Sequence, residues 1–113
     1  MATQDQSSAI HSALAQIHNA LTALDDLIAS ASTEQAKSLK PVYDQLVNLS
    51  TSLAKSQTVA DDAVFKTVTA DLKSQAAQLQ KEDAAMQKVL GEVDKAGKVV
   101  VYIGQGLALI AKL

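Results

Sequence analysis

Apolar residues recur at alternating steps of four and three over the first quarter of this 113-residue chain. This spacing places them on one face of an α-helix, at the a and d positions of a heptad repeat. Thr3 followed by Gln6 fits a capping box, and Asp5 suits the positive end of the helix dipole. The sequence therefore predicts a helix over about residues 4–30, and its stripe consists of Ile10, Leu14, Ile17, Leu21, Leu24 and Ile28.

A second apolar stripe is out of phase with the first and consists of Leu39, Val42, Leu46, Leu49 and Leu53. The phase break predicts a turn near Ser30, with Ser32 or Thr33 as the N-cap of a helix over about residues 33–56. Pro41 then lies inside this helix, where it removes one backbone hydrogen bond. The rival interpretation moves the turn to residues 36–40 and puts Pro41 in the first helical turn. We favour the earlier turn.

A third stripe keeps one heptad phase to the end of the chain, with Gln75 and Glu82 at two inward positions. A polar segment at residues 80–85 offers Asp83 as an N-cap, which predicts helices over about 59–81 and 84–112. If the chain does not turn at residues 80–85, residues 59–112 form a single helix. The members of the stripe are Phe65, Val68, Leu72, Leu79, Met86, Val89, Val93, Ala96, Val100, Ile103, Leu107 and Ile110.

These alternatives predict two all-α architectures for a single helical domain over residues 1–113. With the turn, four helices of similar length form an antiparallel up-down four-helix bundle. Without it, a helical hairpin is joined to one long third helix of roughly 80 Å, which a second chain must cover by oligomerisation. The near-equal helix lengths favour the bundle, while the unbroken phase favours the long helix. We expect the bundle.

The chain lacks the residues that enzymes and metal proteins need. It has no cysteine, so disulfide and thiolate chemistry are excluded. His11 and His18 are seven residues apart, about 10.5 Å along a helix, which is too far for both to bind one metal ion. No glutamate precedes a histidine at the Glu-x-x-His spacing of di-iron bundles. We therefore expect no catalytic, cofactor or metal site, and no enzyme.

The net charge limits the classes of partner to expect, and the N-terminal residues indicate the cellular location. The formal net charge is −2, and the basic residues are ten lysines without an arginine, which argues against nucleic-acid binding. The first ten residues lack the basic and apolar regions of a signal peptide. We expect a cytoplasmic protein unless another export route acts on it.

The segment from Val99 to Leu113 is apolar on every side, and a helix of this kind needs a partner on every side. Its length spans only about 20–23 Å as a helix, less than the roughly 30 Å of a bilayer core. Small residues seven apart, at Gly97, Gly104 and Ala111, predict close approach of another helix. The stripe predicts an inner seam of Val100, Ile103, Leu107 and Ile110, with Val99, Tyr102, Leu109 and Leu113 on the other side.

These features favour a non-enzymatic helical interaction or structural protein. It would form a homo-oligomer or bind a partner helical protein through its heptad seams and the apolar C-terminal helix. The alternative is a membrane-active or lipid-surface protein, such as a pore-forming component, that releases this helix from the bundle onto lipid. The eight apolar residues of the C-terminal segment are the candidate interaction residues in either case.

Overall fold

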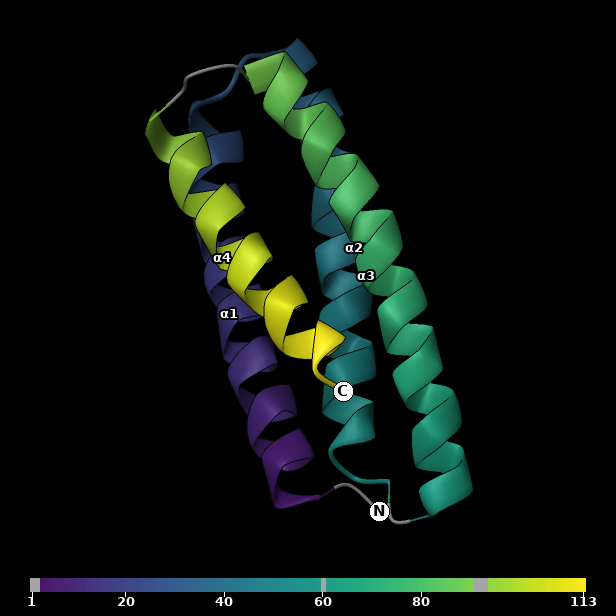
Figure 1. The fold of residues 1–113 in the computed structure, drawn as a ribbon. Coiled ribbons are helices and arrows are strands. Elements are labelled where there is room, and N and C mark those ends of the chain that lie inside the picture. The colour runs from purple at the N-terminus through teal and green to yellow at the C-terminus, as the bar shows by residue number, and fades with distance from the viewer. Residues whose placement is uncertain (1–2, 60, 91–93) are drawn as a thin grey trace.

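The computed structural model describes residues 3–59, 61–90 and 94–113, and this part of the chain forms four α-helices (Figure 1). Their order along the chain is α1 (Gln4–Ser30), α2 (Thr33–Ser56), α3 (Asp62–Leu90) and α4 (Asp94–Ala111). Helices α1 and α2 have the predicted bounds, and Pro41 lies inside α2 as expected from the earlier of the two turns.

Each helix runs antiparallel to the one before it, and the four form a closed ring (Figure 1). Helix α1 packs on α2, α2 on α3, α3 on α4, and α4 returns to pack on α1. Within the described residues the diagonal pairs, α1 with α3 and α2 with α4, have no backbone contact. The elongated shape measures 45 × 18 × 18 Å. The antiparallel up-down four-helix bundle predicted from the sequence is confirmed.

Local capping explains why α1 and α2 begin where they do. The Thr3 hydroxyl accepts a hydrogen bond from the Gln6 backbone N–H (3.1 Å), and the Gln6 side chain accepts one from the Thr3 N–H (3.0 Å). Ser32 and Gln35 form the same reciprocal pair at 3.2 Å. Each box satisfies two N–H groups that the helix itself leaves unpaired. Asp61 caps α3 from just outside the helix by accepting from the Val64 N–H at 3.0 Å.

The predicted turn at residues 80–85 is wrong, and so is the unbroken helix over residues 59–112. Helix α3 continues through the polar segment to Leu90, and α4 begins at Asp94. The segment contains no glycine or proline to end a helix, and Asp83 serves as a buried residue in the middle of α3. Helix α3 therefore begins and ends later than expected, and α4 is correspondingly short. The stripe residues Val89, Val93 and Ala96 lie outside the residues whose side chains are described.

The core of α2 contains every residue of its predicted stripe, all fully buried. Helix α1 differs in part. Its d positions are buried as predicted, but the a positions Leu14, Leu21 and Ile28 are only partly buried. The remaining core residues of α1 lie one position earlier, because the helix is rotated toward α4; they are Ala13, Ala20 and Leu27.

On α3 the buried positions that differ from the prediction lie one residue later, the opposite direction from α1. The core of α3 contains the predicted Phe65, Leu72, Leu79 and Met86, together with Thr69 and Asp83, which replace the expected Val68 and Glu82. Two polar residues therefore lie on the buried side of α3, whereas Ser56 is the one buried polar residue of α2 among those described.

Candidate interaction surface

The described residues contain no group of three or more histidine, cysteine, aspartate or glutamate side chains that could hold a metal ion. His11 is exposed on α1. His18 lies beside α2, with its Nε2 atom 3.0 Å from the Ser50 hydroxyl oxygen. The two histidines thus lie on the edge of α1, where they flank the core. No described helix combines the length and the apolar character needed to cross a membrane.

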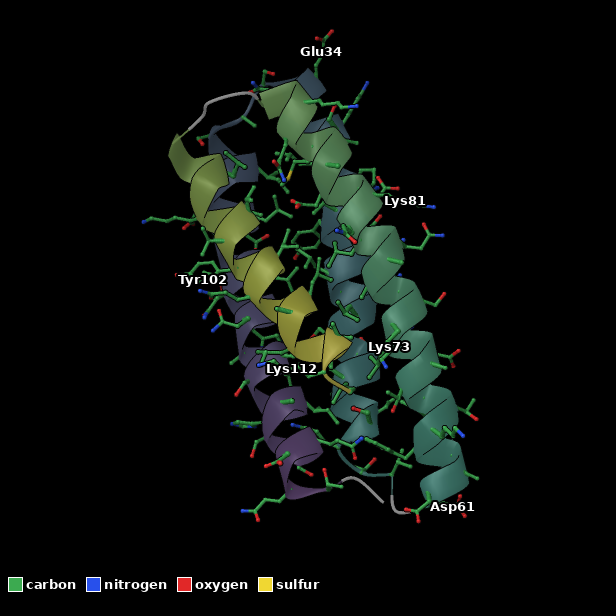
Figure 2. The ribbon with its side chains drawn as sticks, in the orientation of Figure 1. Glu34, Asp61, Lys73, Lys81, Tyr102 and Lys112 are labelled. Atoms are coloured by element: carbon green, nitrogen blue, oxygen red, sulfur yellow. The ribbon has the colours of Figure 1, made fainter. Side chains whose placement is uncertain are left out.

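The predicted interaction residues of α4 belong to the bundle core and its margin. Ile103 and Ile110 are fully buried, as expected of the inner seam, and so is Val99, which was expected on the other side. Tyr102 is partly exposed (Figure 2). The remaining predicted residues are also partly buried and pack against the core; they are Val100, Leu107, Leu109 and Leu113. Most of this surface is therefore covered within the same chain.

Helices α1 and α4 meet at Gly106. A Cβ atom built on Gly106 would lie 2.8 Å from Ile17 Cδ1 and 3.8 Å from the Ala13 carbonyl oxygen. Only a residue without a side chain fits such a contact unshifted. Gly97 and Gly104, which were predicted to mark the close approach, have nothing within 4 Å of the corresponding position. The close contact exists, but the sequence prediction chose the wrong glycines.

A groove separates α4 from α3 on the opposite side, and we call it the α3–α4 groove. It has a volume of about 440 Å³, and half of its lining residues are alanines, whose small side chains do not fill the space between the helices. Helix α3 has 29 residues and α4 has 18, so α3 continues past the end of α4 (Figure 1). The lining residues are Lys73, Ala76, Ala77 and Gln80 of α3, and Leu107, Ala108, Ile110 and Ala111 of α4.

The outer face of α4 continues the groove onto the surface. Val101 is 55% exposed, more than Val64 (50%) and Val47 (40%), the other exposed large apolar residues among those described. Between Lys98 and Lys112 the helix has no charged residue. The sequence prediction missed this face because it selected the large residues of α4. The signal was the three-and-four spacing of the smaller or polar residues Val101, Gly104, Gln105, Ala108 and Lys112.

The buried side of α3 contains polar atoms that lack partners within the protein. Asp83 is 8% exposed; its Oδ2 accepts from Gln87 Nε2 at 3.1 Å, and its Oδ1 accepts no hydrogen bond. Burial raises the pKa of Asp83 above its ordinary value of 3.8, and the hydrogen bond from Gln87 lowers it in part. Gln75 donates to the Ser52 hydroxyl at 3.0 Å, while its own Oε1 is buried without a partner. Glu82, the acid expected to point inward, is partly exposed.

Among the described residues α3 has two buried polar atoms without a partner, Gln75 Oε1 and Asp83 Oδ1, and α1 has one, Gln16 Oε1. A buried polar atom without a hydrogen bond costs about 1–3 kcal/mol. Asp83 has no second carboxylate in a metal-binding group with it. We therefore interpret its burial as a feature of stability, and the candidate functional surface remains the α3–α4 groove.

Comparison with protein-family models, curated protein sequences and solved structures found no significant match to this chain.

Proposed function

We propose that this chain is a non-enzymatic interaction protein that binds a helix of a partner protein through the α3–α4 groove and the adjoining outer face of α4. The observation that carries the proposal is the groove itself, an open apolar channel between two helices lined by Ala76, Ala77, Ala108 and Ala111. Small residues let another helix approach closely, and a convex helix matches the shape of such a channel.

The heptad seams are closed within the bundle, which favours binding of a separate partner over self-association through those seams. The large apolar residues of α1, α2 and α4 are already buried against each other. A second copy cannot use them without opening the bundle. The apolar surface that stays accessible on α4 is the groove and Val101, which at 55% is the most exposed large apolar residue among those described.

The direct test is NMR of protein labelled at its alanine methyl groups. The probe is an uncharged amphipathic peptide of three heptads, with leucine at a and d and glutamine at the flanking positions. We expect its addition to shift the methyl signals of Ala76, Ala77, Ala108 and Ala111, which line the groove.

A matched pair of variants locates the response. Ala108→Trp places a bulky side chain in the groove and should abolish the shifts. Ala54→Trp makes the same change on the exposed face of α2 and should leave them intact. The proposal is overturned if the groove methyl signals do not respond to the peptide, or if both variants respond alike.

A further inference from the structure

The charges around the α3–α4 groove are all of one sign. Lys73 is the one charged residue among those that line it. Lys112 is exposed and lies directly after the last residue of α4. Figure 2 shows Lys73 on α3 beside the C-terminal end of α4 and Lys112 on the other side of that end, and Lys112 does not line the groove. Neither the lining residues nor the described part of α4 from Gly97 onward includes a carboxylate side chain.

Helix α3 extends this basic edge beyond α4. Lys66 precedes Lys73 by seven residues, a spacing that keeps both on one face of the helix, and both are exposed. Gln80 follows at the same spacing and lines the groove without adding charge. A ligand lying along the groove and past the end of α4 therefore meets Lys73 and Lys66 of α3.

This charge pattern argues against a second copy as the occupant. Antiparallel two-fold pairing through the outer face of α4 would bring Lys98 of one copy near Lys112 of the other. Like charges placed together oppose such pairing. The most acidic helix of the chain is α1, which has Asp5, Asp25 and Asp26 on its surface but no exposed large apolar residue. Helix α1 of a second copy therefore lacks the apolar stripe needed to enter the groove.

We propose that the α3–α4 groove binds an acidic amphipathic helix from a different protein. Its apolar side chains enter the alanine-lined channel, and its carboxylates lie beside Lys73 and Lys66. The inference rests on the proposed function and adds the chemistry of the partner. Complementary charge of this kind selects the partner and its orientation, while the apolar channel supplies the burial.

The experiment compares three fluorescently labelled three-heptad peptides by fluorescence anisotropy. All have leucine at a and d, and their flanking positions hold glutamate, glutamine or lysine. We expect the glutamate peptide to bind about tenfold more tightly than the glutamine peptide, the effect of two exposed charge pairs. The lysine peptide should bind most weakly. The glutamate preference should fall as the salt concentration rises.

Charge-reversal variants decide whether the groove causes the preference. Lys66→Glu combined with Lys73→Glu should invert the order, so that the lysine peptide binds more tightly. The control, Lys37→Glu combined with Lys55→Glu, makes the same change in charge on α2 and should preserve the order. Circular dichroism melting of both double variants verifies that the bundle remains folded.

Each other outcome overturns a specific part of the argument. Equal binding of the three peptides at the groove overturns the acidic partner and leaves the proposed function standing. Binding to vesicles containing phosphatidylglycerol, without binding to any peptide, overturns both in favour of a lipid surface. Retention of the glutamate preference by the Lys66→Glu/Lys73→Glu variant places the site that binds the acidic peptide elsewhere on the protein and overturns the inference.

Discussion

Gly106 of α4 lies directly against Ile17 of α1, so close that a Cβ atom on the glycine would be 2.8 Å from the isoleucine Cδ1. Ile17 is fully buried, so its side chain has little free space into which it could move. The missing side chain at position 106 therefore lets the Ile17 side chain pack directly on the backbone of α4. This contact holds the face of α4 that contains Ile103 and Ile110 in the core.

We expect Gly106→Ala to destabilise the protein relative to Gly104→Ala by about 1–3 kcal/mol, the usual cost of overpacking. Gly104 has nothing within 4 Å, so alanine there gains up to about 1 kcal/mol of helix propensity without a clash. Urea unfolding measures both variants. Ile17→Val removes the clashing Cδ1 atom and should recover much of the loss in the double variant. Equal stabilities for the two glycine variants would contradict the close contact.

Asp83 should make stability depend on pH. Because its folded-state pKa is raised, the folded protein binds the proton more tightly than the unfolded chain does. The resulting stability is present below the ordinary carboxyl pKa of 3.8 and is lost as pH rises through the higher folded value. Asp83→Asn should therefore gain stability over the wild type as pH increases from about 3 to 7.

Chemical unfolding across that pH range measures the difference between Asp83→Asn and the wild type. Asp71→Asn removes an exposed carboxylate from the same helix and is the control for the loss of one negative charge from α3. A constant difference for Asp83→Asn over the whole range would rule out a raised pKa in the core.

Pro41 lies in the interior of α2 and is exposed. Proline cannot donate the hydrogen bond that an interior helical residue supplies, and its ring crowds the preceding turn. We expect Pro41→Ala to raise the free energy of unfolding by about 1–3 kcal/mol. Asn48→Ala, at another exposed position of α2, should change it by less than about 1 kcal/mol. Thermal melting compares the two, and a destabilised Pro41→Ala protein would assign the proline a packing role.

Ile103 and Val101 are two residues apart on α4 but have opposite environments, 0% and 55% exposed respectively. Ile103→Asp places an unpaired charge in the core and should abolish cooperative unfolding. Val101→Asp should melt close to the wild type. Far-ultraviolet circular dichroism distinguishes these outcomes. A folded Ile103→Asp protein would contradict the position of α4 in the bundle.

The protein on its own should be a monomer with a mass of 11.8 kDa by light scattering after size exclusion. The reason is that the heptad seams are closed within one chain. A stable dimer would require a surface other than these seams. In that case Val101→Asp would be the first variant to measure for loss of the dimer.

The parts of the fold that the sequence predicted well depend on local interactions. The boundaries of α1 and α2 follow from the pairs Thr3–Gln6 and Ser32–Gln35, each three residues apart. The end of α3 was mispredicted because Asp83 has the side chain of an N-cap but occupies a core position. Gly91 follows the last residue of α3, and a glycine just after a helix is the better sequence signal for its end.

The heptad spacing of apolar residues could not by itself decide which residues of α3 and α4 are most deeply buried. The inner face of a bundle helix is wider than the a and d seam of a two-stranded coil. On α3 this leaves the choice between Val68 and Thr69 to the neighbouring helices, and the polar residue is the one buried. On α4 the same ambiguity exchanged Val99 and Val100, so the free surface at Val101 and Ala108 could be found only from the packed bundle.

The return of α4 to α1 has a consequence for the order in which the molecule acquires its structure. The helices that meet at Gly106 and Ile17 are separated along the chain by the whole α2–α3 hairpin. Contacts between such distant residues require closure of a long loop, which is slow compared with hairpin formation. The neighbouring pairs α1–α2 and α2–α3 can associate first. Ala13 and Ala20 then stay exposed to solvent until α4 docks. Docking of α4 is then the step that commits the chain to its native state.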